Sequence, residues 1–335
     1  MAGWSSSKLP YSAGWFSIVY GGGKFVALDS STYRIAYSTN AISWSSARIP
    51  SGEFWLRLAY GAGRFVAVSG DGHYAFSNDG SSWAVAKLPS GIAPSALCFG
   101  NGKFIAMGSG STFLYSSDGL NWTSGTLPTS GNWQGIAFGD GRFVAVGTSN
   151  VSIYSTDGVN WATVTGLPGR GWGGVTYGNG RFVAVGTTGA MYSTDGKRWR
   201  AADMPADGTW ANIAFGDGKF VAPMYESNIV AYSSDGATWG KENLPVSAAW
   251  QGIAYGNGKF VTLAQSSTIA AYINQEDVVP PEPAPTPGWD DLNLWVGVDG
   301  TARKGAALWV GVDGAARPVT AAWVGDAEGR ARRFF

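Results

Sequence analysis

Few side chains in this chain of 335 residues are suited to acid–base or nucleophilic chemistry. His73 is the only histidine and Cys98 the only cysteine, which excludes metal sites with two histidines and an intramolecular disulfide. Cys98 replaces a small residue of an otherwise regular strand pattern, so we expect an inert, buried thiol. We accordingly expect no catalytic residue, no metal and no cofactor.

Carboxylates could still form a pair for general acid–base work. Six of them fall in predicted loops on one face: Asp29, Glu53, Asp71, Asp203, Asp207 and Glu226. Nothing in their spacing brings two of them to the separation that glycoside hydrolysis requires. The sequence therefore favours a protein that is not an enzyme.

A cation recurs at one position throughout most of the chain. The set comprises Lys24, Arg64, Lys103, Arg142, Arg181, Lys219 and Lys259. One interpretation is structural, with each cation paired to turn carboxylates or carbonyls, and the alternative is a ring that docks an anion or a partner. The structural interpretation is favoured, because a feature present in every unit is usually about building the unit. Lys and Arg number 23 in total, as do Asp and Glu, so no net field recruits nucleic acid.

These cations mark a segment of about 39 residues that occurs seven times. Successive copies of its Gly-x-Gly-Lys/Arg-Phe core begin at Gly21, Gly61, Gly100, Gly139, Gly178, Gly216 and Gly256. Each complete copy contains four short β-type runs separated by turn residues, such as WQGIAF, RFVAVG, VSIYS and NWATVT from Trp133. Regular units of four antiparallel strands predict an all-β, seven-bladed β-propeller.

The two ends of the repeat region complement each other. The seventh copy stops near Tyr272 without its last strand, whereas the chain opens with WSSSKLP, which matches that strand. We expect residues 4–9 to form the outer strand of the last blade and so to close the ring.

The Ser-x-Asp-Gly-x-x-Trp turn, present in the second to sixth copies and degenerate at Asn40-Ala41 in the first, resembles the Asp-box (BNR) repeats of sialidases and related propellers, although it is one residue shorter. The resemblance implies a structural role for the aspartates, which close the turn on backbone amides. They are Asp79, Asp118, Asp157, Asp195 and Asp235. It implies no hydrolase.

The loops on the opposite face differ from copy to copy. They are rich in Ser, Thr, Gly and Asn, and they carry Tyr33, Phe54, His73 and Tyr225. Aromatic rings beside hydroxyl and amide groups suit sugar binding, so these four residues are the candidate ligand-binding set. Six tryptophans that open the innermost strands lie near this rim, and packing between blades is the favoured interpretation for them.

After residue 275 the composition changes. Residues 1–275 are the predicted propeller, 276–288 a Pro-rich linker, and 289–335 three 14-residue β-hairpin repeats marked by Trp295, Trp309 and Trp323. So small a module should pack on itself, on sister chains as a homo-oligomer, or on a partner. Its WVGVDGxAR pattern, read together with the GNGKFVAV and YSTDGxxW pieces, resembles tail-associated proteins of phages and prophages.

The resemblance implies a virion protein, and the first reading is a non-enzymatic structural component whose propeller loop face binds a host-surface glycan or other receptor. Residues 289–335 would contact other virion proteins, and no signal peptide or membrane span is evident. The alternatives are a decoration or fibre scaffold with no ligand and, third, a carbohydrate-active enzyme on the same fold.

Overall fold

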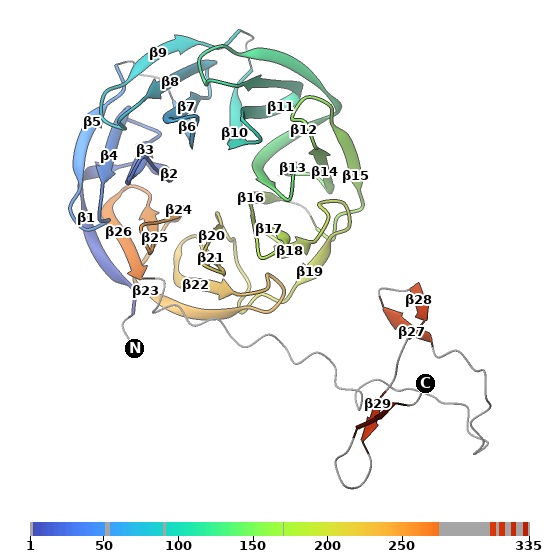
Figure 1. Ribbon diagram of the computed structural model, residues 1–335. Coiled ribbons are helices and arrows are strands. Elements are labelled where there is room, and N and C mark those ends of the chain that lie inside the picture. The colour runs from blue at the N-terminus through green and yellow to red at the C-terminus, as the bar shows by residue number, and fades with distance from the viewer. Residues whose placement is uncertain are drawn as a thin grey trace. The chain divides into compact units, whose positions relative to one another are not determined.

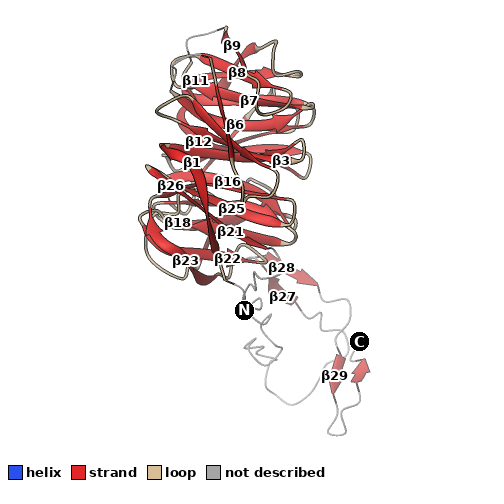
Figure 2. Ribbon diagram, turned by 90° about the vertical axis from the view of Figure 1, so that its left-hand side faces the viewer, coloured by secondary structure: helices blue, strands red, loops and turns tan. Residues whose placement is uncertain are grey.

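The computed structural model describes residues 3–50, 54–89, 92–169 and 171–274, together with 309–312, 315–318, 323–325 and 331–333. Every regular element in these ranges is a β-strand, which confirms the all-β prediction (Figure 2). The chain divides into two compact units, Met1–Ala284 and Pro285–Phe335.

The larger unit is a β-propeller in which antiparallel strands run outward from the centre of a ring (Figure 1). The first two repeats supply β2 (Trp15–Gly21), β3 (Lys24–Asp29), β4 (Arg34–Ser38), β5 (Ser45–Arg48), β6 (Trp55–Gly61), β7 (Arg64–Ser69), β8 (His73–Ser77) and β9 (Ala84–Lys87). The third and fourth supply β10 (Pro94–Gly100), β11 (Lys103–Ser116), β12 (Thr123–Gly139), β13 (Arg142–Gly147), β14 (Val151–Ser155) and β15 (Ala162–Thr165).

The remaining repeats follow the same pattern. The fifth and sixth supply β16 (Trp172–Gly178), β17 (Arg181–Gly186), β18 (Gly189–Ser193), β19 (Arg200–Ala202), β20 (Ala214–Gly216), β21 (Lys219–Pro223), β22 (Ser227–Ser233) and β23 (Gly240–Ala248). The last sheet contains β24 (Trp250–Gly256), β25 (Lys259–Ala264), β26 (Ser267–Asn274) and, from the start of the chain, β1 (Ser5–Ala13).

Counted as hydrogen-bonded sheets, the described propeller has six blades, and the predicted seven is wrong. Five sheets have four strands, and the sixth has six strands in the order β10-β11-β12-β13-β14-β15. This sheet takes in the third and fourth repeats, because β11 and β12 each span two of the predicted β-type runs. Ser109 and Gly110 pair with Asn132 and Gly131, so the link between these two repeats stays in the ladder instead of leaving it as a loop.

The ring is closed by the N-terminal strand, as predicted. β1 pairs antiparallel with β26, and Ser5 lies opposite Tyr272 and Lys8 opposite Ile269. The strand is longer than residues 4–9, since it continues to Ala13, which lies opposite Ser267 after a register shift. Closure therefore covers an edge that would otherwise expose unpaired backbone groups.

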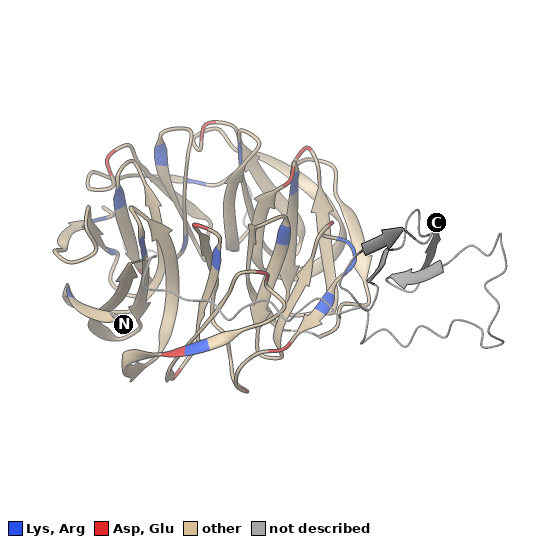
Figure 3. Cartoon of the chain, turned by 60° about the horizontal axis from the view of Figure 1, so that its bottom comes forward, with Lys and Arg blue, Asp and Glu red and all other residues tan. Residues whose placement is uncertain are grey.

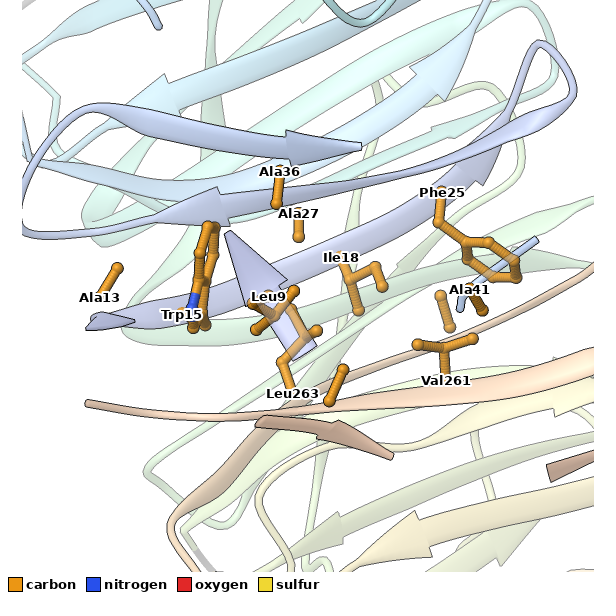
Figure 4. Close-up of a cluster of buried hydrophobic side chains, with 12 residues drawn as sticks. Leu9, Ala13, Trp15, Ile18, Phe25, Ala27, Ala36, Ala41, Val261 and Leu263 are labelled. Carbon is orange, nitrogen blue, oxygen red and sulfur yellow. The ribbon is translucent and has the colours of Figure 1, made fainter. Parts of the chain in front are cut away.

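Hydrophobic clusters lie between neighbouring repeats and join them. The cluster at the closure combines Leu9 and Trp15 from the beginning of the propeller with Val261 and Leu263 from its last repeat. All four side chains are fully buried (Figure 4). The innermost tryptophans are among the largest fully buried side chains: Trp15, Trp55, Trp133, Trp172, Trp210 and Trp250. Burial of one such side chain stabilises the fold by about 1.5–3 kcal/mol. Packing is thus the role of these rings, and they are not available as a sugar platform.

A glycine at the end of each innermost strand sets how closely the next repeat can approach. A Cβ built on Gly139 would lie 1.9 Å from Cγ of Tyr177, an aromatic residue in the following repeat. The same relationship crosses the closure, where a Cβ on Gly256 would lie 2.0 Å from Cγ of Tyr20. Only glycine leaves room for these rings.

In the smaller unit, β27 (Trp309–Val312) pairs with β28 (Ala315–Pro318), and β29 (Trp323–Gly325) pairs with β30 (Ala331–Arg333). These ladders fall in the second and third predicted 14-residue repeats. The linker 276–288 and the hairpin expected from Leu294 lie outside the described residues, and the predicted domain boundaries stay predictions. No helix in the described part of the chain could span a membrane.

Candidate functional site

The two faces of the propeller are built from different turns. One face carries the Gly-x-Gly hairpins and the Asp-box turns, and the other carries the loops between second and third strands and the links between repeats. The first is called the turn face here, and the second the loop face. Repeated features gather on the turn face, and the loop face carries the residues that differ.

The Asp-box turns are held by the hydrogen bonds that the resemblance implied. Oδ1 of Asp118 accepts bonds from the backbone N–H groups of Leu120 and Asn121, both at 2.8 Å. The hydroxyl of Ser116 donates to the same carboxylate at 2.9 Å. These bonds hold the pKa of Asp118 well below its usual range, and the bond from the backbone N–H of Asn121 has the largest effect. Asp79 and Asp157 have lowered pKa values for the same reason.

The first repeat has Asn40 where the second to sixth have aspartate, and the same hydrogen bonds form. Oδ1 of Asn40 accepts from the N–H groups of Ile42 and Ser43 at 2.9 Å each. The turn therefore needs an acceptor oxygen at this position, and a charge is not required. This supports a structural role for the whole set.

The seven cations of the predicted ring each begin the second strand of a repeat, and Figure 3 shows Lys and Arg at several places on the propeller. All seven side chains are half-buried at the first position of a strand.

At least three of them donate to the next repeat. Nζ of Lys24 lies 2.8 Å from the carbonyl oxygen of Asp79, and Nη1 of Arg142 lies 2.8 Å from that of Asp195. Nη1 of Arg181 reaches the carbonyl of Asp235 at 2.6 Å. These bonds favour the structural interpretation over a docking ring.

Of the four candidate ligand-binding residues, three come from adjacent repeats of the loop face. Phe54 is the most exposed large hydrophobic side chain among the described residues at 67%, and Tyr33 is 40% exposed. Tyr33 also has a left-handed backbone conformation with φ of 50°. Two exposed aromatic side chains in neighbouring repeats suit contact with a flat, partly apolar ligand.

His73 and Tyr225 are placed less favourably. His73 is the first residue of β8 rather than a loop residue, and its Nδ1 lies 3.6 Å from Oδ1 of Asp71. Tyr225 belongs to the sixth repeat, on the far side of the seventh from Tyr33, and its backbone N–H donates to the carbonyl of Thr209. Burial and the neighbouring Glu226 raise the pKa of Tyr225. The structure therefore does not gather the four residues into one site.

Two hollows on the loop face were not predicted as sites. The larger, of about 450 Å³, lies in the fourth repeat and is lined by Thr148, Ser149, Asn150, Leu167, Pro168 and Gly169. The other, of about 350 Å³, includes Thr187, Asp203 and Asp207 in its lining. The signal was present in the sequence, because these segments are the variable loops, but no aromatic residue drew attention to them. Among the described residues no group of three or more His, Cys, Asp or Glu side chains could hold a metal ion.

Known proteins resemble this chain in fold and not in sequence. No family model matches the chain, and no curated protein does. Virginiamycin B lyase from Staphylococcus aureus superposes with a TM-score of 0.72 at 14% identity, over 81% of this chain and 98% of the lyase. YCF48 from Cyanidioschyzon merolae gives 0.66 at 13% identity, over 82% of this chain and 100% of YCF48. YCF48 bound to D1 peptide gives 0.65 at 14% identity, over 81% and 95%. At such identities the likeness shows the β-propeller fold alone.

Proposed function

We propose that this chain is a non-enzymatic structural protein of a bacteriophage or prophage virion, associated with the tail, and that its loop face binds a host-surface glycan or other receptor. The observation that carries the binding role is the division between the two faces. The turn face uses its repeated polar groups to build and join the repeats, whereas the loop face exposes Phe54 and Tyr33 and carries the two polar hollows.

The chemistry of the loop face fits a neutral, hydroxyl-rich ligand. Aromatic rings supply stacking surface, and Ser, Thr and Asn side chains supply both hydrogen-bond donors and acceptors. The hollows are partly open to solvent, which suits a chain of sugars lying on the surface better than a small molecule enclosed in a pocket.

The virion context rests on the resemblance of the repeats and of the C-terminal module to phage tail-associated proteins. Residues 289–335 would attach the propeller to other virion proteins. The lyase among the structural neighbours is an enzyme, but its likeness to this chain concerns the fold alone.

A glycan array with the full-length chain tests the binding role. We expect selective binding that Phe54→Ala reduces by about tenfold or more, because removal of an aromatic anchor at a hot spot costs 2 kcal/mol or more. Ile42→Ala is the matched control, since Ile42 is 49% exposed but lies on the turn face. Equal losses from both variants, or selective binding that survives loss of Tyr33, Phe54 and the loop at Thr148, would contradict the assignment of the face.

A further inference from the structure

One arginine occupies a position that no other repeat gives to a charged residue. Arg57 is the third residue of β6, two places after Trp55, in the innermost strand of the second repeat. The equivalent residues in the other repeats are uncharged: Ser17, Ala96, Gly135, Gly174, Asn212 and Gly252. Because the repeat does not require a cation here, Arg57 is not explained by the building of the propeller.

The contacts of Arg57 come from three different repeats. Its guanidinium carbon lies 4.7 Å from the ring centroid of Phe16 in the first repeat. Nη2 lies 3.5 Å from the carbonyl oxygen of Gln134 in the fourth repeat, and Nη1 lies 3.1 Å from that of Leu56. A side chain that reaches from the second repeat to both the first and the fourth extends across the inner ring toward the propeller axis. Each innermost strand begins at the loop face, so this point is near that face.

The charge of this group is not balanced nearby. No carboxylate of the described residues forms an ion pair with Arg57. Loss of water lowers the pKa of Arg57 to about 10, which leaves the guanidinium protonated at neutral pH. Two of its five N–H donors have protein acceptors, and the bond to Gln134 is at the long limit for a hydrogen bond. Arg57 is half-buried, and none of its nitrogen atoms is both buried and without a partner, so the remaining donors can reach a ligand.

We propose that Arg57 binds an oxyanion group, a carboxylate or a phosphate, on a ligand that reaches the propeller axis from the loop face. The planar fork of a guanidinium matches two oxygens of such a group with parallel hydrogen bonds. The ring of Phe16 packs against one face of the guanidinium and helps to hold it in place. None of the six equivalent residues carries a negative charge that would compete. This site goes beyond the proposed function, because it does not depend on what the outer loops bind.

Titration calorimetry of the full-length chain at pH 7 and low salt tests the proposal, with inorganic phosphate, D-glucuronate and, as the neutral counterpart of the latter, D-glucose. We expect phosphate or glucuronate to bind and glucose to give no heat. Arg57→Met should weaken that binding by about tenfold or more, because it removes the cation that would pair with the anion. Arg57→Lys, which keeps the charge but not the fork, should give an intermediate loss.

Arg48→Met is the matched control, since Arg48 is exposed and should leave the affinity unchanged. Binding of phosphate alone assigns a phosphoryl ligand, and binding of glucuronate alone assigns a carboxylate. Undiminished affinity in Arg57→Met, or no binding of either anion at about 20 mM, overturns the proposal. Phe54→Ala should leave anion binding intact, which separates failure of this site from failure of the glycan assay.

Discussion

The side-chain amide of Asn257 donates to the backbone carbonyl of Thr39 at 3.2 Å, across 218 residues of sequence. Asn257 lies in the hairpin turn of the last repeat, and Thr39 precedes the Asp-box position of the first. The same bond joins Asn101 to Thr156 and, at 2.8 Å, Asn179 to Ser234. A turn residue thus fastens each of these repeats to the next, and the last to the first.

Ala62 occupies the equivalent turn position in the second repeat, with a left-handed φ of 47°. Ala62→Asn should stabilise the protein by about 0.5–1.5 kcal/mol, because the amide can reach the carbonyl of Ser117 and asparagine tolerates this backbone conformation. Urea unfolding measures the change. Ala62→Gly is the control, as it relieves the backbone without adding the bond. If the two variants are equally stable, the hydrogen bond contributes nothing.

Leu9 should carry much of the closure. It is fully buried in the cluster that joins the two ends of the propeller, so Leu9→Ala is expected to cost about 2–5 kcal/mol. Its neighbour Lys8 is exposed on the same strand, and Lys8→Ala should change the free energy of unfolding by less than about 0.5 kcal/mol. Thermal unfolding of both variants tests this, and deletion of residues 1–9 should lower the melting temperature further. An unchanged melt in the deletion variant would refute the role of β1.

The contact of Gly139 with Tyr177 predicts a strong coupling between the two positions. Gly139→Ala forces a methyl group into the tyrosine ring and should destabilise by about 1–3 kcal/mol or more. Tyr177→Ala leaves a cavity, but in the double variant the clash is gone. A double-mutant cycle should therefore give a favourable coupling of about 0.5–3 kcal/mol. If the changes in unfolding free energy of the two single variants simply add in the double variant, the two positions are not coupled and the prediction is wrong.

The Asp-box turns should make the protein sensitive to acid. The folded-state pKa of Asp118 is below the ordinary 3.8, so its stabilising effect is complete above about pH 4 and is lost as the pH falls from 3.8 through the folded-state value. Asp118→Asn should fold, as Asn40 does naturally, and should show a shallower loss of stability between pH 4 and pH 2. Asp217→Asn, in a hairpin turn, is the control. Parallel acid melts of wild type and Asp118→Asn would contradict this account.

The repeating chemistry was predictable because each signal occurs many times. Seven copies of the Gly-x-Gly turn and five Asp-boxes predicted the strands, the closing strand and the structural role of aspartates such as Asp118. The predicted blade count was wrong because β12 runs without a break from Thr123 to Gly139 and so joins two repeats in one sheet. This continuity arises because Ser109 and Gly110 pair with the link between those repeats. No residue type marks that pairing.

The candidate site was harder to predict for the opposite reason. Loop-face residues occur once each, so the sequence offered their types but not their neighbours. Phe54 and Tyr33 proved exposed, whereas His73 lies at the start of a strand beside Asp71. The contacts of Arg57 could not be predicted, because an arginine within a strand is usually a surface residue. Only the closed ring places this position of the innermost strand beside the first and fourth repeats. The sequence predicts the glycines that face Tyr177 and its equivalents only as hairpin residues. Their contacts with the next repeat cannot be inferred from the residues of one copy.

The closing strand also has a consequence for folding during synthesis, because it must wait for its partner strand to be made. β1 is synthesised before the other strands of the propeller, but its partner β26 begins at Ser267, about 250 residues later. At 5–20 residues per second the first strand waits roughly 10–50 s before it can pair. During that interval its buried residue Leu9 and its unpaired backbone are available to chaperones, or to the same strand of another nascent chain. Correct assembly of the propeller therefore depends on keeping β1 unpaired until translation of the last repeat is complete.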